Sequence, residues 1–224
     1  QGSTARVSND FATLKYGKTD PRFTDGETPI DNWTTAQKNL GFTSTTIEGE
    51  EVAHCYGKNG YLKLGDDKGH GADLISPYTN TLRSDSLLMV SFRAVTGARD
   101  DNKITVEVLG GGVIRDFAQS EKTTIDLEAG YYDISSEEFP EDMWEGHDFL
   151  VFVAGTKANP IPANTRVRII CGSLTQNSAV NNRIYLDNFY IRRLQKVEED
   201  YFAENNGSGK DIILGAPFDE EEQE

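Results

Sequence analysis

The sequence is poor in positive charge and contains no long hydrophobic run. Its 224 residues carry 22 lysines and arginines against 37 aspartates and glutamates, which gives a net charge of −15. Nucleic acids and anionic membranes bind basic surfaces, so this balance argues strongly against both as partners. No apolar run approaches the ~18 residues that a membrane-spanning helix requires, so no transmembrane segment is expected. The length predicts one domain that can bury a self-sufficient core.

Cysteine and histidine are also scarce. Cys55 and Cys171 are the only cysteines, and both lie in apolar, strand-like runs. We interpret them as two buried thiols, with a single disulfide between the two halves of the chain as the alternative. Two cysteines are too few for a zinc cage unless histidines join them, and His54, His70 and His147 show no ligand spacing. We therefore expect no zinc site.

What the sequence does contain is alternation of apolar and polar residues. Runs of this kind lie at 86–95, 103–110, 123–128, 147–155, 165–173 and 183–194. In the last run, alternation predicts one face with Ile184, Leu186, Asn188, Tyr190 and Arg192, and another with Tyr185, Asp187, Phe189 and Ile191. Lys58-Asn59-Gly60 predicts a tight hairpin. About ten to twelve short strands with almost no helical periodicity indicate an all-β fold, a two-sheet antiparallel β-sandwich.

The composition changes near the C-terminus. Residues 1–195 carry the strand pattern and are expected to form the sandwich domain. Residues 196–224 end in a nearly all-acidic run that is typical of a solvated tail. Ile212, Ile213, Leu214 and Phe218 are apolar enough to dock on the sandwich, so a trailing arm and a docking strand both remain open.

Four segments occur in an order that resembles a known group of modules. They are 8–11 (SNDF), 33–42 (WTTAQKNLGF), 72–77 (ADLISP) and 183–191 (RIYLDNFYI). Together they resemble the galactose-binding-like jelly-roll modules, including carbohydrate-binding modules, of bacterial and especially Bacteroidetes-type cell-surface proteins. The resemblance implies a jelly roll over about residues 6–194 and says less about function, because one fold hosts many functions.

The same resemblance implies a structural calcium ion. In such modules the aspartate of the closing strand binds calcium together with oxygens of the N-terminal segment, which points here to Asp187 and Asp10. The family's glutamate after the phenylalanine is Ala12 in this chain, so one strong ligand is missing. The alternative is that Asp187 caps backbone amides or pairs with an arginine such as Arg183. In either case a buried carboxylate needs a partner, and Asp187→Ala is expected to cost at least about 2 kcal/mol of stability.

Signals for catalysis are weak. Some β-sandwich glycosidases carry two catalytic glutamates in an E-x-D-x-x-E strand, but here Thr124 stands two residues before Asp126, where the nucleophile would be. No Gly-x-Ser-x-Gly nucleophile elbow occurs. We therefore expect no catalytic residues, and an orphan glycoside hydrolase is only a minor alternative.

Candidate binding residues lie in loops between the expected strands. Sugar binding uses flat aromatic faces and planar polar groups, and Trp144, Tyr131, Tyr132, Arg115 and Asp116 supply both types. Trp144 could instead form a lid over the sandwich end, and at least one of the two tyrosines must point inward.

These features predict a non-catalytic, extracytoplasmic module that recognises carbohydrate through loop aromatics. It would lie at the cell surface, as a lipoprotein anchored to the outer membrane or as a secreted protein. The alternative is a structural or accessory protein that docks on a larger outer-membrane or cell-surface complex, with a glycan replaced by a protein partner.

Overall fold

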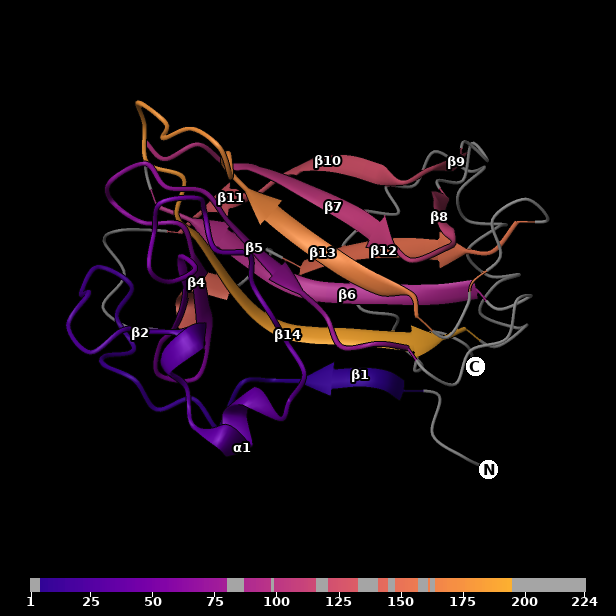
Figure 1. Cartoon of the computed structure of the whole chain (residues 1–224), viewed down its shortest axis with the longest axis horizontal. Coiled ribbons are helices and arrows are strands. Elements are labelled where there is room, and N and C mark those ends of the chain that lie inside the picture. Colours follow the sequence, from indigo (N-terminus) through magenta and orange to yellow (C-terminus); the bar gives the residue numbers. More distant parts are fainter. Residues whose placement is uncertain are drawn as a thin grey trace.

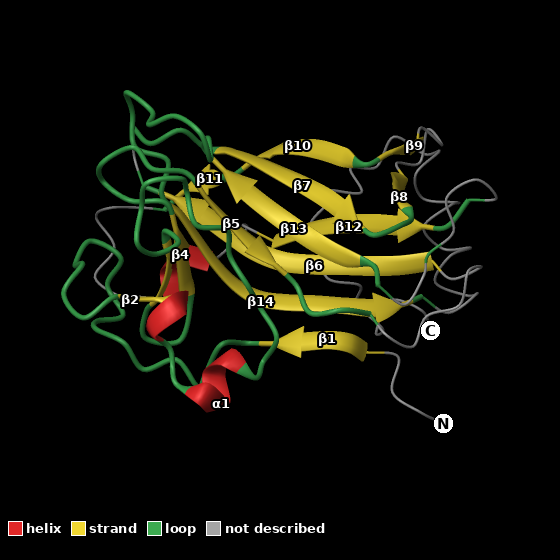
Figure 2. Ribbon diagram, viewed as in Figure 1, coloured by secondary structure: helices red, strands yellow, loops and turns green. Residues whose placement is uncertain are grey.

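The chain folds into two stacked β-sheets that are almost entirely antiparallel (Figure 1, Figure 2). The computed structural model describes residues 5–79, 87–97, 99–115, 121–132, 141–144, 148–156, 161 and 164–194. The predicted all-β sandwich is confirmed. The tail at 196–224 and Asp116 lie outside the described residues, so the domain boundary and the docking role of the tail stay predictions.

The larger sheet has ten strands, with the order β2-β3-β4-β14-β6-β12-β8-β9, and with β1 paired to β14 and β11 to β6. Its strands are β1 (Ala5–Asn9), β2 (Thr28–Pro29), β3 (Cys55–Gly57), β4 (Leu62–Leu64), β6 (Leu87–Thr96), β8 (Val113–Arg115), β9 (Glu121–Lys122), β11 (Gly130–Tyr131), β12 (Asp148–Ala154) and β14 (Ile184–Arg193). The smaller sheet has the order β10-β7-β13-β5, with β5 (Ala72–Ile75), β7 (Lys103–Leu109), β10 (Thr124–Glu128) and β13 (Arg166–Cys171).

Helical structure in the described ranges is limited to single turns. These are η1 (Ile30–Asn32), α1 (Thr35–Lys38) and η2 (Glu141–Trp144). No helix among the described residues is long and apolar enough to cross a membrane.

The core lies between the two sheets and follows the alternation of the sequence. From β7 and β13 it receives alternate residues, namely Ile104, Val106, Val108, Val167, Ile169 and Cys171; from β6 it receives Leu88, Val90, Phe92 and Ala94. Both cysteines are buried as free thiols, and burial raises the pKa of the Cys171 thiol to about 12. The interpretation as buried thiols is confirmed. The hairpin at Lys58–Gly60 is also confirmed, because β3 and β4 pair across it and Gly60 has a φ of +90°.

The closing strand β14 departs from simple alternation. Asn188 has a φ of +50°, and the register with β6 shifts between Asp187 and Tyr190. This β-bulge adds one residue, so every side chain after it changes face. Phe189 and Ile191 therefore join Ile184 and Leu186 in the core. The expected assignment of residues to the two faces was wrong from Asn188 onward.

Candidate binding site

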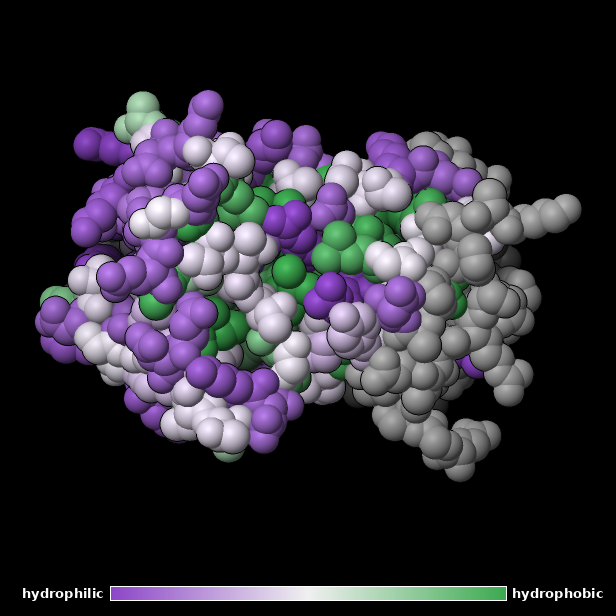
Figure 3. Space-filling view, in the orientation of Figure 1, coloured by the Kyte–Doolittle hydropathy of each residue, from purple (hydrophilic) through white to green (hydrophobic). Residues whose placement is uncertain are grey.

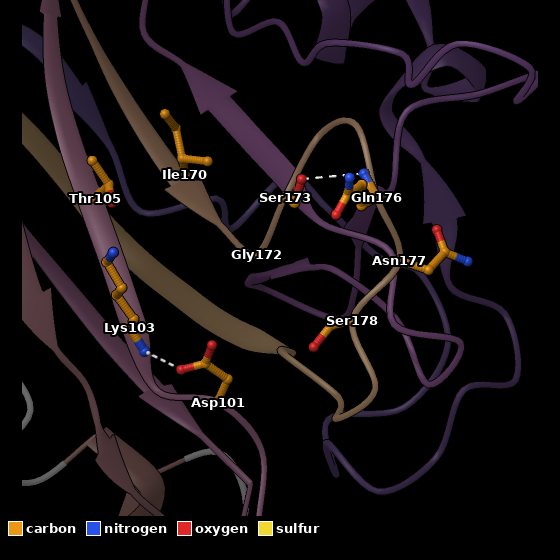
Figure 4. Close-up of a pocket in the computed structure, with 9 residues that line it drawn as sticks. All are labelled: Asp101, Lys103, Thr105, Ile170, Gly172, Ser173, Gln176, Asn177 and Ser178. Atoms are coloured by element: carbon orange, nitrogen blue, oxygen red, sulfur yellow. Dashed lines mark hydrogen bonds between the residues drawn. The ribbon is translucent and has the colours of Figure 1, made fainter.

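A pocket of about 340 Å³ opens at the end of the smaller sheet where β7 begins and β13 ends (Figure 4). The loops at this end, on the left of Figure 1, carry mostly hydrophilic residues in Figure 3. The pocket is lined by residues of the β6–β7 loop, of β7, of β13 and of the loop that follows β13: Asp101, Lys103, Thr105, Ile170, Gly172, Ser173, Gln176, Asn177 and Ser178.

Alternation along β7 decides which of its side chains line the pocket. Ile104 points into the core, so its neighbours Lys103 and Thr105 point outward. The Thr105 hydroxyl donates to a carboxylate oxygen of Asp126 at 2.7 Å, and Lys103 Nζ lies 3.4 Å from the other oxygen. The hydrogen bond from Thr105 is the main cause that lowers the pKa of Asp126. This wall therefore presents the ammonium group of Lys103 and the hydroxyl group of Thr105 to the pocket.

The opposite wall is the loop after β13, and its backbone is held by one serine. Ser173 Oγ accepts hydrogen bonds from the backbone N–H groups of Thr175 and Gln176, both at 3.1 Å. Such a turn removes freedom from the loop before any ligand binds. In Figure 4, Gln176 and Ser178 lie across the pocket from Asp101 and Lys103.

Two glycines of the β4–β5 loop support this wall from behind. A Cβ atom on Gly69 or Gly71 would come within 3.0 Å of the backbone of Ser178 or Ser173, respectively. The N–H of Ser178 donates to the carbonyl of Gly69 at 2.8 Å. Only glycine permits this approach, so the loop at 65–71 and the pocket wall pack backbone against backbone.

The lining can form many hydrogen bonds, but its described residues contain no pair of carboxyl groups. Its groups include an ammonium, two amides and several hydroxyls, which can donate to and accept from a polar ligand. Among the described lining residues, Asp101 is the only carboxylate, and its Oδ1 accepts from the N–H of Lys103 at 3.1 Å. Glycoside hydrolysis commonly needs two carboxyl groups that flank the bond, and this pocket does not supply them.

Two of the predicted binding residues lie in the interior. Trp144 is 5% exposed and Tyr132 is 8% exposed. They belong to an aromatic cluster, in which the Trp144 ring centroid lies 5.6 Å from that of Tyr61, and the Tyr132 centroid 6.0 Å from that of Tyr185. Neither ring offers an open face to a sugar. The expected use of both rings as open binding faces is therefore corrected, because packing against other aromatic rings buries more apolar area than an open loop would. The expectation that at least one of the two tyrosines points inward is confirmed.

The other two described candidates, Tyr131 and Arg115, lie far apart in the structure. Tyr131 is 48% exposed, and its hydroxyl donates to the carbonyl of Asp100 at 3.3 Å, next to the pocket residue Asp101. Arg115 lies in β8, at the opposite end of the sandwich in Figure 1, and pairs with Glu121 at 3.3 Å. Of the described candidates, only Tyr131 is placed beside the pocket.

The two expected calcium ligands come from neighbouring strands: Asp10 directly follows β1, whose last residue pairs with Phe189, two residues after Asp187. Burial is the main cause that raises the pKa of Asp187 to about 7, and the charge of Asp10 adds to the rise. Asp187 Oδ1 is buried, and no hydrogen-bond partner is found for it in the described part of the chain. The alternative partner Arg183 instead binds Asp100, with Nε 2.8 Å from Oδ2. Two carboxylates with an unbonded oxygen suit a hard cation, so Asp187 and Asp10 would hold calcium here, and this assignment stays a proposal.

Another group of residues has no counterpart in the sequence pattern. The rings of His54 and His70 stack with centroids 4.0 Å apart, and Glu50 lies beside both. The spacing of these residues matches no short metal motif, so the sequence analysis missed the group. The local signals are two spacings of four residues, because Glu50 contacts His54 and Asp66 contacts His70.

Comparison with known proteins identifies no family. No family model matches the chain, and no curated protein matches it.

Some solved structures share a broadly similar arrangement. The K3 adhesin domain of Lys-gingipain from Porphyromonas gingivalis is 11% identical, with 84% of this chain and 99% of that chain covered and a TM-score of 0.41. The xylan-binding CBM22-1 domain of Paenibacillus barcinonensis Xyn10C is 11% identical, with 87% and 97% covered and a TM-score of 0.38. The Stig cyclase Fisc of Fischerella sp. TAU is 12% identical, with 85% and 98% covered and a TM-score of 0.44. Similarity at this level carries no argument about function.

Proposed function

We propose that this protein is a non-catalytic module that binds carbohydrate in the pocket between β7 and the loop after β13. The observation that carries the proposal is the lining itself. Charged, amide and hydroxyl groups from three parts of the chain converge on about 340 Å³. Sugars present closely spaced hydroxyls that both donate and accept, and planar or charged side chains of this kind can bind them in pairs.

Tyr131 supplies the aromatic part of the proposed site. Its ring is half exposed and is anchored through its hydroxyl to Asp100, beside the pocket. A tyrosine held in this way loses little conformational entropy when an apolar sugar face stacks on it.

The charge of the protein restricts the class of glycan. A net charge of −15 repels polyanions, so a neutral glycan fits better than a sulfated or uronate-rich one. Polymeric glycans of this kind lie mainly outside the cytoplasm, and the proposal therefore places the module on the cell surface or in the secreted fraction.

Affinity gel electrophoresis with soluble neutral polysaccharides, preceded by a glycan array, tests the proposal. We expect retention of the wild-type protein by at least one neutral glycan. Lys103→Ala and Gln176→Ala should each weaken it roughly 2- to 10-fold, the value of one hydrogen bond. Thr124→Ala is the matched control, because Thr124 is exposed at the far end of β10, opposite Glu107.

Two results would overturn the proposal. One is a wild-type protein that no neutral glycan retains. The other is retention that survives both pocket variants unchanged while their circular dichroism spectra match the wild type, which would place the ligand elsewhere.

A further inference from the structure

Three side chains, from the segments that precede and follow the β3–β4 hairpin, converge beside it. Glu50 precedes His54, His54 immediately precedes β3, and His70 lies in the loop after β4. Glu50 Oε1 lies 2.8 Å from His70 Nε2, and Glu50 Oε2 lies 3.8 Å from His54 Nε2. One ligand atom from each residue lies within 4.8 Å of the other two. A small convergence of these atoms would bring all three to the 2.0–2.2 Å that zinc requires.

The opposite nitrogen of each imidazole is already engaged. His70 Nδ1 lies 2.6 Å from Asp66 Oδ2, and His54 Nδ1 lies 2.8 Å from the hydroxyl of Tyr56. With hydrogen on Nδ1 in both rings, each Nε2 has its lone pair on the side of Glu50. Histidines that bind metals are usually held in this way, by a carboxylate or another acceptor on the second nitrogen.

Asp66 is itself held in place by the backbone. Its Oδ1 accepts hydrogen bonds from the N–H groups of Lys68 and His70, at 2.8 and 3.1 Å. The carboxylate therefore orients the His70 ring through a rigid turn.

Hydrogen bonds among the described protein groups of this cluster leave one buried atom, His54 Nε2, without a partner. His54 is 6% exposed, and its Nε2 is buried with no hydrogen-bond partner in the described structure. Glu50 and Asp66 both contact His70, but neither gives His54 Nε2 a hydrogen bond. A buried polar atom without a partner is costly, and a bound cation would remove that cost.

We propose that Glu50, His54 and His70 bind one divalent transition-metal ion. Two imidazole nitrogens and one carboxylate form a ligand set that suits zinc and other borderline ions, whereas calcium and magnesium prefer oxygen ligands. Glu50 is 36% exposed, so the site opens to solvent on that side and water completes the coordination. The inference is independent of the proposed glycan binding.

The site would also stabilise the pocket wall. His70 lies between Gly69 and Gly71, the two glycines that pack against Ser178 and Ser173. A metal that joins His70 to His54 would tie this loop to the β3–β4 hairpin and restrain the wall behind the pocket.

Titration calorimetry with zinc chloride, on protein without a histidine tag, tests the inference, with elemental analysis of the dialysed protein as a second measurement. We expect one equivalent of zinc and a higher melting temperature in its presence, because an ion that binds only the folded state stabilises it. Loss of an outer partner of a metal ligand costs about 10–100-fold in affinity, so Glu50→Gln and His70→Gln should each cost at least about 10-fold. Calcium and magnesium should give no heat that depends on Glu50.

Glu51→Gln is the matched control and should bind zinc like the wild type, because Glu51 is an exposed carboxylate next to Glu50 in the sequence. Glu50→Gln keeps the inference testable if the histidine variants fail to fold, because Glu50 lies on the surface. The inference is overturned if the wild type takes up no zinc, or if Glu50→Gln and Glu51→Gln bind it equally well.

Discussion

Asp187 stands opposite Arg93 in the β14–β6 pair, yet the two form no ion pair. Arg93 Nε instead donates to Asp148 of β12 at 3.0 Å. Asp187 accepts a hydrogen bond from the backbone of Asn188, and its Oδ1 keeps no partner in the described structure. A half-buried carboxylate therefore stands opposite an arginine that pairs with another residue, and the charge of Arg93 offsets only part of the effect of burial on the pKa of Asp187.

The first prediction concerns this carboxylate and pH. The folded-state pKa of Asp187 is raised from 3.8 to about 7, so the folded state holds its proton more tightly than the unfolded state. Its destabilising effect is absent below pH ~4, grows between ~4 and ~7, and is complete above ~7. In EDTA, Asp187→Asn should therefore be more stable than the wild type at pH 8, by up to a few kcal/mol, and equal to it near pH 4. Urea unfolding at both pH values measures this difference, and a difference independent of pH would contradict it.

This expectation reverses the one drawn from the sequence for the metal-free protein. There, removal of Asp187 was expected to cost stability, on the assumption that a buried carboxylate has found a partner. In the structure, Arg183 binds Asp100 instead.

Calcium provides the second prediction. If Asp187 and Asp10 hold the ion, millimolar calcium should raise the melting temperature of the wild type, because the ion binds only the folded state. The rise should disappear in Asp187→Asn and persist in Asp126→Asn, whose carboxylate is on the exposed face of β10. Differential scanning calorimetry with and without calcium measures the effect. An equal rise in both variants would place the ion elsewhere.

The third prediction separates the two aromatic residues of the expected binding site. Trp144 is buried against Tyr61, so Trp144→Ala should destabilise the fold by about 3–5 kcal/mol. Tyr131 is half exposed, so Tyr131→Ala should change stability by less than about 1 kcal/mol while it weakens glycan binding. Chemical unfolding and affinity electrophoresis of the two variants test this pair. Glycan binding lost in Trp144→Ala with unchanged stability would restore the original expectation.

The fourth prediction concerns the support of the pocket wall. Gly69 has a φ of +81°, and a Cβ there would meet the backbone of Ser178. Gly69→Ala should cost about 2–4 kcal/mol, from backbone strain and steric overlap together, and should weaken both ligand and zinc binding. Gly49→Ala is the control, because Gly49 has a similar φ of +88° with open space around it. Its cost should stay near ~1 kcal/mol, and equal costs at the two positions would show that the wall does not depend on the close approach.

Local sequence determined much of this protein. Alternation of Ile104, Val106 and Val108 with polar residues predicted both the strand β7 and its buried face, because side chains on a strand point to opposite sides in turn. Asn59-Gly60 predicted the hairpin, because that pair tolerates positive φ. The apolar, strand-like runs around Cys55 and Cys171 likewise predicted that both thiols are buried.

The tertiary structure alone decided the face of Phe189 and Ile191, the burial of Trp144 and the meeting of His54 with His70. Each depends on contacts between residues from different elements: a register shift against β6, a shared aromatic cluster, and a hairpin that folds one loop onto another. Local patterns indicate the alternation of side chains along a strand, but they do not specify which distant strand pairs with it. Packing between elements settles that choice, and here it also assembled the pocket beside β7 and the proposed metal site.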